Sequence, residues 1–163
     1  MAVFNDWHEL KKVLDKERAG GRRLVFTNGC FDLLHAGHVH LLKQAKELGD
    51  ILLVAINSDD SIRKIKGDDR PFVEQDDRAF MLDALAAVDH VVIFTQSTPM
   101  ELLDFFRPDI LVKGDQYAFD EVVGSDFVVG YGGQVKTVSI RPNLSSSSIA
   151  QRIRQSVPAD EPA

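Results

Sequence analysis

The sequence predicts an α/β fold: a single domain built on a doubly wound sheet of five parallel strands. Two observations support this prediction. Short apolar runs of strand length alternate with segments of helical periodicity along the whole chain. The run ILLVAIN (51–57) is nearly all apolar, as expected for a strand that is covered on both faces. Strands that alternate with helices join into a parallel sheet through right-handed crossovers.

Apolar and β-branched runs mark the expected strands, and helical patterns separate them. The strands are expected at 24–26, 51–57, 91–94, 109–113 and 135–140. The helices are expected at 6–18, 39–48, 76–88, 98–106, within 124–133 and from 147 onward. We divide the chain into an N-terminal helix (1–21), a core (22–155) and a frayed tail (156–163).

Composition narrows the range of partners. The 163 residues suit one domain with a hydrophobic core, and the net charge of −6 comes without a basic cluster. This argues against a nucleic acid or an acidic membrane as the main partner. The single cysteine, Cys30, allows no intrachain disulfide. The sequence shows neither a signal peptide nor an apolar run of about 20 residues, so we expect a cytoplasmic protein.

The residues that follow the first expected strand form the strongest candidate site. In a doubly wound sheet, ligands bind outside the carboxyl ends of the strands. Here the stretch TNGCFDLLHAGH contains a tight turn at Asn28 and Gly29, and the next helix begins near Gly37. The free N–H groups and the dipole of a helix start favour a phosphate at this position.

Two histidines strengthen this interpretation. His35 and His38 are three residues apart, so they lie on one face of the first helical turn. Imidazoles beside a helix start can donate hydrogen bonds to phosphate oxygens, and they do so better when protonated. One alternative is that the histidines cap the helix or lie at the surface. Another is a zinc site, but only Cys30 or Asp32 could supply its third ligand.

Lysines and glycines follow two other expected strands. Lys64 and Lys66 precede a glycine and resemble a mobile, phosphate-grasping segment, although such a segment is often only a solvated loop. Lys113, Gly114 and Asp115 lie at the carboxyl end of the fourth strand. These residues would add positive charge to the edge of the sheet at which a ligand is expected.

A run of serines precedes the last helix. SSSS (145–148) could cap that helix, and it could also offer hydroxyl and N–H groups to an anion. The chain contains no GxGxxG, GxxxxGK[ST] or GxSxG motif. The serines are therefore interpreted as binding residues and not as nucleophiles.

Taken together, these segments resemble the cytidylyltransferase-like nucleotidyltransferases. NGCFDLLHAGH is similar to the signature of that family, whose HxGH motif binds the triphosphate. The segments KIKGDDRPFVEQDDRAFMLDAL, PDILVKGDQY, VVGSDFVVGYGGQVKTV and SSSSI resemble the branch that adenylylates heptose 1-phosphate. The resemblance covers roughly 22–155 and implies a Rossmann-like fold.

The resemblance implies a reaction and its partners. An oxygen of a sugar 1-phosphate, D-glycero-β-D-manno-heptose 1-phosphate, would attack the α-phosphorus of ATP and expel pyrophosphate, giving ADP-heptose. Mg²⁺ would be the cofactor, held mainly by the triphosphate and not by protein ligands. Catalysis would come from positioning and charge stabilisation. Relatives pair through helices beside the sheet, so a homodimer is compatible with the resemblance.

The resemblance also assigns residues by position. The implied catalytic residues are His35, His38 and Lys66. The implied nucleotide-binding residues are Asn28, Gly29, Cys30, Phe31, Lys64, Lys113, Gly114, Asp115, Ser145, Ser146 and Ser147. Asp32 is expected to orient a loop through His35. No role follows for Arg70, Arg78, Gln116 or Arg141.

Two other functions remain open at the level of sequence. A cytidylyltransferase that uses CTP and glycerol 3-phosphate would need the same phosphate-binding residues. A nucleotide-binding regulatory module without turnover is a second alternative, and the intact histidines and lysines argue against it.

Overall fold

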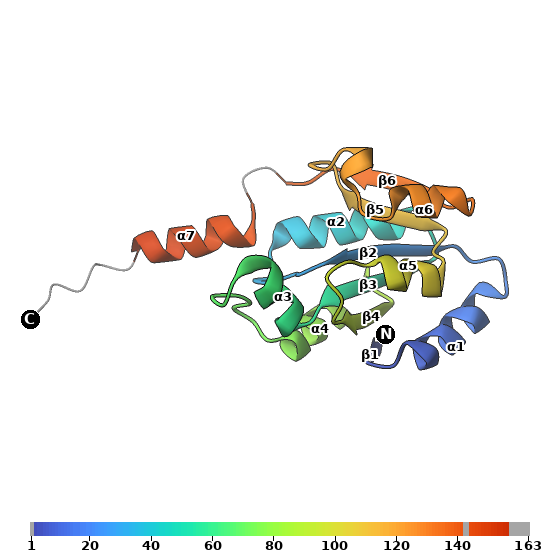
Figure 1. The fold of residues 1–163 in the computed structure, drawn as a ribbon, viewed down its shortest axis with the longest axis horizontal. Coiled ribbons are helices and arrows are strands. Elements are labelled where there is room, and N and C mark those ends of the chain that lie inside the picture. Colours follow the sequence, from blue (N-terminus) through green and yellow to red (C-terminus); the bar gives the residue numbers. More distant parts are fainter. Residues whose placement is uncertain (1, 142–143, 157–163) are drawn as a thin grey trace, which may run out of the picture.

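The chain forms one parallel sheet with helices on both faces (Figure 1). The computed structural model describes residues 2–141 and 144–156. The strands are β1 (Ala2–Phe4), β2 (Leu24–Gly29), β3 (Ile51–Asn57), β4 (His90–Phe94), β5 (Ile110–Gly114) and β6 (Gln134–Val138). The helices are α1 (Trp7–Arg18), α2 (Ala36–Glu47), α3 (Asp59–Lys66), α4 (Gln75–Asp83), α5 (Met100–Phe106), the 3₁₀ turn η1 (Phe119–Glu121), α6 (Ser125–Gly130) and α7 (Ser146–Ser156).

The parallel α/β sheet is confirmed, but the predicted number of five strands is wrong, because the described residues form six. The additional strand, β1, lies in the segment 1–21 that was expected to be only helical, and it pairs with β4 from Ala2↔His90 to Phe4↔Val92. A run of three residues is too short to show the alternation by which a strand is recognised. Apart from Ser156, the expected frayed tail lies outside the described residues.

The lysine segment after β3 also differs from the expected loop. Residues 59–66 form the helix α3, and the Ser58 hydroxyl caps it by accepting the N–H of Ser61 at 3.2 Å. The helix ends at Gly67, whose φ of 94° is readily adopted only by glycine. This helix was not predicted, because most of its residues are charged and its buried side chains, Ser61 and Ile62, fall within a single turn.

The order of the strands places the switch point beside β2. The sheet runs β1-β4-β3-β2-β5-β6, so the chain winds outward from β2 through β3 to β4 and then crosses to the other side at β5. Paired residues join β2 to β3 as far as Gly29↔Ile56, whereas β2 and β5 are paired only as far as Phe26↔Leu111. The carboxyl ends of β2 and β5 therefore separate, which is where ligands bind in such sheets.

Alternate side chains of the strands form two cores. On one face, Leu24 and Phe26 of β2 pack with buried residues of α1, α5 and α6. On the other face, Val25 packs with buried residues of α2 and α4. Burial on both faces explains why the central strands read as continuous apolar runs. Among the described residues, no helix has the length and apolar character needed to cross a membrane.

Aspartates fix the amino ends of the strands. Each of three carboxylates accepts the N–H of a residue at or next to the start of a neighbouring strand, within 2.6–2.7 Å: Asp50 from Arg23, Asp89 from Leu52 and Asp109 from Leu24. Asp109 also accepts two hydrogen bonds from Arg18 of α1, at 3.0 and 3.1 Å. These contacts hold the sheet in register at the edge opposite the switch point.

Candidate active site

A cavity of about 740 Å³ lies at the carboxyl ends of the strands. Its walls come from the segments that follow β2, β3, β4, β5 and β6, together with the start of α7. All predicted site residues except Lys64 and Asp115 line it. Those that do are Asn28, Gly29, Cys30, Phe31, His35, His38, Lys66, Lys113, Gly114, Ser145, Ser146 and Ser147. The fold thus gathers residues from four distant parts of the sequence into one site.

The two histidines form the start of α2. The Nδ1 atom of His35 accepts the N–H of Gly37 at 3.1 Å, and the Nδ1 atom of His38 accepts the N–H of His35 at 3.4 Å. The rings stack with their centroids 3.8 Å apart and their planes 20° apart. Because each Nδ1 accepts a proton donor, each neutral ring carries its own proton on Nε2. His35 thus caps the helix and also lines the cavity.

Gly37 is required between these rings. A Cβ atom at position 37 would lie 2.9 Å from Cε1 and Nδ1 of His35, closer than carbon atoms approach without displacement. A side chain there would push the His35 ring away from its cap and from His38. The glycine therefore permits the stacked arrangement that the HxGH spacing produces.

Burial keeps both imidazoles neutral in the free protein. Burial, with smaller contributions from His35 and Lys66 and against the opposing effect of Asp32, lowers the pKa of His38 to about 4. Burial also lowers the pKa of His35. At neutral pH the rings therefore act as uncharged Nε2–H donors, and a bound polyphosphate would raise the pKa of His38.

The two lysines of α3 lie differently. Lys66 lines the cavity and its charge reaches His38, whereas Lys64 does not line the cavity. In a helix, residues two positions apart point in different directions. The free structure therefore places Lys66, but not Lys64, where it can contact a ligand.

Lys113 closes the gap at the switch point. Its ammonium group donates to the backbone carbonyl of Asn28 at 2.8 Å, beyond the last paired residues of β2 and β5. Burial lowers the pKa of Lys113 to about 8. The group is therefore largely charged at neutral pH and supplies a positive charge at the floor of the cavity.

Asp32 orients a loop, although not through His35 as expected. The carboxylate is 1% exposed and accepts from Arg70 Nη1 at 3.0 Å and from the N–H groups of Phe72 and Val73 at 3.0 and 3.1 Å. These contacts hold the loop after α3 against the site. Among the described residues, no group of three His, Cys, Asp or Glu side chains could hold a metal ion, so the structure gives no support to the zinc alternative.

Sequence reasoning gave no role to Arg78, yet among the described residues its side chain is the largest that is fully buried. Its guanidinium donates to the carbonyls of Val73, Cys30 and Asn57 at 2.9, 2.6 and 2.9 Å. It also donates to the Asp59 carboxylate at 2.7 Å. One signal was present in the sequence: Arg78 shares a helical face with the buried Leu82, four residues later.

The serine run serves two purposes. Ser145 and Ser148 exchange hydrogen bonds between their hydroxyls and backbone N–H groups, both at 3.0 Å, and so cap α7. The Ser146 hydroxyl donates to the backbone carbonyl of Asp32. Figure 1 shows α7 projecting beyond the carboxyl ends of the strands. The serines are thus both a helix cap and one wall of the cavity.

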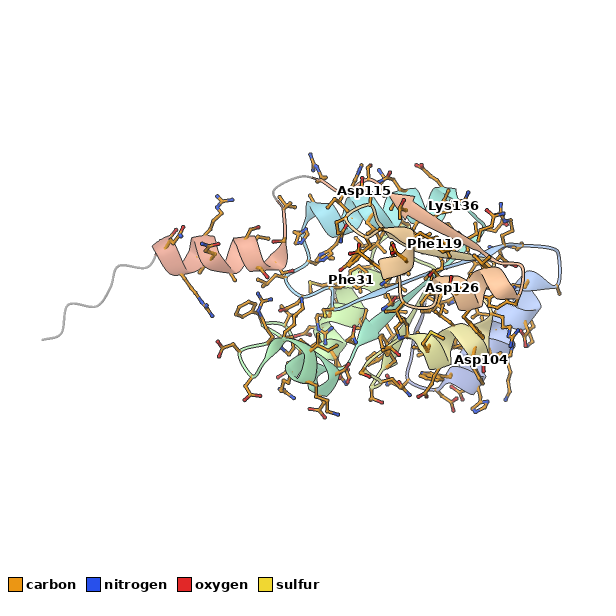
Figure 2. The ribbon with its side chains drawn as sticks, turned by 45° about the horizontal axis from the view of Figure 1, so that its top comes forward. Phe31, Asp104, Asp115, Phe119, Asp126 and Lys136 are labelled. Carbon is orange, nitrogen blue, oxygen red and sulfur yellow. The ribbon has the colours of Figure 1, made fainter. Side chains whose placement is uncertain are left out.

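Asp115 faces the edge of the sheet. Its carboxylate accepts the N–H of Ile140 at 3.3 Å, which ties the end of β5 to the segment after β6. Figure 2 shows Asp115 near the upper margin of the molecule. Gln116, for which no role was predicted, lines the cavity instead. Its Oε1 atom would lie 2.1 Å from a Cβ at Gly114, so the glycine makes room for this amide.

The family follows from this site together with a sequence match. A profile of the family described as cytidylyltransferase-like matches residues 26–152. The chain belongs to this family, and its class is that of the nucleotidyltransferases. Among curated proteins, it is 50% identical over 144 residues to the Bifunctional protein HldE of Syntrophotalea carbinolica, covering 88% of this chain and 29% of the relative.

A second relative and one solved structure agree with this assignment. The chain is 48% identical over 151 residues to the Bifunctional protein HldE of Nitratiruptor sp., covering 93% of this chain and 32% of the relative. It therefore spans about a third of the length of these relatives. A lipopolysaccharide core biosynthesis protein from Thermoplasma volcanium has a TM-score of 0.61 and 31% identity, covering 74% of this chain and 98% of that one.

The other solved structure is a pantothenate synthetase from Thermus thermophilus, with a TM-score of 0.63. It is 15% identical, with 93% of this chain and 70% of that chain covered. This second likeness shows the fold alone.

Proposed function

We propose that this protein transfers the adenylyl group of ATP to a heptose 1-phosphate, giving ADP-heptose and pyrophosphate. The observation that carries the proposal is the near-complete match of this chain to one part of proteins named Bifunctional protein HldE. The lipopolysaccharide core biosynthesis protein points to the same area of metabolism. The chain spans about a third of the curated relatives, so we assign it one of their two activities.

The geometry of the site supports in-line transfer without a covalent intermediate. The Nε2–H groups of His35 and His38 and the start of α2 would bind the triphosphate, and the two rings would donate to the oxygen that bridges the α- and β-phosphates. Negative charge grows on this oxygen as pyrophosphate leaves. Donors fixed before the reaction stabilise such charge more effectively than mobile ones. Lys66 and Lys113, which both line the cavity, would add positive charge.

The acceptor must enter the same cavity beside the α-phosphate. Its phosphate oxygen attacks the α-phosphorus, the bond from that phosphorus to the bridging oxygen breaks, and both electrons leave with pyrophosphate. A phosphate monoester is already ionised at neutral pH, so the attack needs no general base. Positioning two anions side by side is therefore the main task of the cationic residues.

Mg²⁺ fits this site as a partner of the triphosphate. The groups that line the cavity around the histidines are chiefly N–H donors, and the Asp32 carboxylate is already bound by Arg70 and backbone N–H groups. Mg²⁺ prefers oxygen ligands, and here the phosphates would supply them. When bound, the ion neutralises part of the phosphate charge.

A substrate panel tests the proposal. The protein is incubated with Mg²⁺, one of ATP or CTP, and one of heptose 1-phosphate or glycerol 3-phosphate, and pyrophosphate release is measured. We expect release with ATP and heptose 1-phosphate. Release only with CTP and glycerol 3-phosphate would establish the cytidylyltransferase alternative. Tight ATP binding without turnover of any acceptor would establish a regulatory module.

A further inference from the structure

Three side chains from distant elements bind alternate carbonyls of the chain that enters the site. Lys113 of β5 donates to the carbonyl of Asn28, Arg78 of α4 to that of Cys30, and Ser146 of α7 to that of Asp32. Each of these carbonyls belongs to a peptide unit whose N–H is that of the next residue. Fixing the oxygen therefore fixes the direction of the following N–H.

The backbone between β2 and α2 needs such support. Phe31 and Leu33 have φ angles of 50° and 48°, in the left-handed region that costs a residue with a side chain roughly 1–2 kcal/mol. Conformations of this kind persist only where the surroundings fix them. Each of these residues directly follows a carbonyl that is bound by Arg78 or Ser146.

Arg78 is an unusual choice if its only task is to support the fold. The side chain is 0% exposed, so its charge loses all hydration, and its one anionic partner is Asp59. Its guanidinium makes four hydrogen bonds to three separate segments of the chain, around Cys30, around Asn57 and Asp59, and at Val73. Buried charge is costly to retain, and it is most often kept where it fixes a functional geometry.

Two of these contacts, with the carbonyls of Cys30 and Asn57, reach residues that line the cavity, and the Cys30 contact fixes the peptide that ends at the Phe31 N–H. Arg78 does not line the cavity, whereas Cys30 and Phe31 do. The carbonyl and the N–H of a trans peptide point in opposite directions, so the Phe31 N–H points away from Arg78. In the part of the chain that the structure describes, this N–H has no protein acceptor. A charged donor on the carbonyl also polarises the peptide and strengthens its N–H as a donor.

We propose that Arg78 is a positioning residue: by binding the Cys30 carbonyl from behind, it aims and polarises the Phe31 N–H so that this group donates to a phosphate of the substrate. Arg78 itself never touches the ligand. The inference deepens the proposed function and rests on it for the identity of the phosphate, which is that of a nucleoside triphosphate. The arrangement of the peptide itself does not depend on which reaction follows.

The first test uses the free protein. The Phe31 amide proton is followed by NMR in wild type, in Arg78→Ala and in Arg18→Ala. Arg18 is a matched control, because it also binds a carbonyl and an aspartate, but at the opposite edge of the sheet. We expect an upfield shift and faster hydrogen exchange at Phe31 only in Arg78→Ala. Equal changes in the two variants would overturn the proposal. If Arg78→Ala does not fold, we use Arg78→Lys instead. This variant keeps the positive charge but loses the planar guanidinium that donates several hydrogen bonds.

The second test uses ATP and Mg²⁺ as ligand, with affinity measured by calorimetry. We expect the Kd of Arg78→Ala to rise at least 10-fold, the scale of one hydrogen bond to a charged group. Methylguanidinium, which fits the space left by the side chain, is expected to restore part of the affinity in Arg78→Ala and none in Arg18→Ala. An unchanged Kd, or a loss without rescue that matches Arg18→Ala, would overturn the proposal.

The two tests separate this inference from the proposed function. If wild-type protein binds no ATP, both the proposed function and the role of a nucleotide phosphate as acceptor of the Phe31 N–H are contradicted. The NMR signal of Phe31 would still decide whether Arg78 orients the peptide. Wild-type protein that binds ATP but transfers nothing would contradict the proposed reaction, while the comparison of Arg78→Ala with Arg18→Ala would still decide the inference about Arg78.

Discussion

The imidazole of His38 stacks on that of His35 with 3.8 Å between centroids, and the Nδ1 atom of each ring is taken up by a backbone N–H of the same helical turn. The helix start thus fixes the two Nε2–H groups side by side. Each donor is oriented by the backbone before any ligand arrives, which is the condition under which donors stabilise developing charge most strongly.

Loss of the second ring tests this arrangement. We expect His38→Ala to lower kcat on the order of 10² to 10⁴, because a group that stabilises transition-state charge is removed. His40→Ala is the matched control: it changes the same residue type in the same helix, its ring approaches Ser139, and it does not line the cavity. Equal rates for His38→Ala and the wild type would show that the ring is only structural.

Binding of ATP is expected to take up protons. The pKa of His38 in the free protein is about 4, so the ring is neutral at pH 6, and the negative phosphates raise the pKa in the complex. By linkage, affinity for ATP rises as the pH falls from 7 towards 5. Calorimetry at pH 6 in two buffers of different ionisation enthalpy measures the uptake. His38→Gln isolates the contribution of the ring, and identical uptake in both proteins would refute it.

The two lysines at the end of α3 form a natural pair for comparison. Lys66, which was predicted to be catalytic, lines the cavity, whereas Lys64, which was predicted to bind the nucleotide, does not. We expect Lys66→Ala to weaken ATP binding by roughly 10- to 100-fold, the value of one charge-assisted hydrogen bond. Lys64→Ala is expected to change it less than 3-fold at moderate salt, where surface charges are screened. A larger loss in Lys64→Ala would mean that α3 turns when the ligand binds.

Lys113 is expected to make the free energy of unfolding depend on pH in the alkaline range. Its pKa is about 8 in the folded protein and 10.5 in the unfolded chain. Between these values the unfolded chain binds more protons, so the free energy of unfolding rises with pH, by at most about 3 kcal/mol. The difference between wild type and Lys113→Met, measured by chemical denaturation at pH 7.5 and pH 10, isolates this group. A difference that does not change with pH would mean that Lys113 is not desolvated.

Hydrophobic periodicity correctly predicted those strands and helices whose apolar residues are buried in the core. The central strands were predicted because both of their faces are covered, and the phosphate-binding edge followed from the order of strands and helices. The strand β1 was missed because Ala2–Phe4 is too short to show alternation. The helix α3 was missed because most of its residues are charged and exposed. The predicted homodimer and cytoplasmic location stay predictions.

The periodicity of the sequence could not predict contacts between distant segments. The resemblance implied that Asp115 binds the nucleotide, but its carboxylate accepts the N–H of Ile140 and does not line the cavity. Arg78 directly follows two aspartates, Asp76 and Asp77, in the sequence, and only the folded chain brings Cys30 and Asn57 within its reach. Such long-range hydrogen bonds leave no local spacing in the sequence.

In the proposed reaction, the α-phosphorus of ATP loses its bond to pyrophosphate and forms a bond to the phosphate of the sugar. The most direct measurement follows the label from [α-³²P]ATP and from [γ-³²P]ATP into products in the presence of heptose 1-phosphate and Mg²⁺. We expect the α-label to appear in the nucleotide sugar and the γ-label in pyrophosphate. Gamma-label on the sugar would reveal a kinase, and no transfer of either label would leave the stacked histidines without the reaction assigned to them.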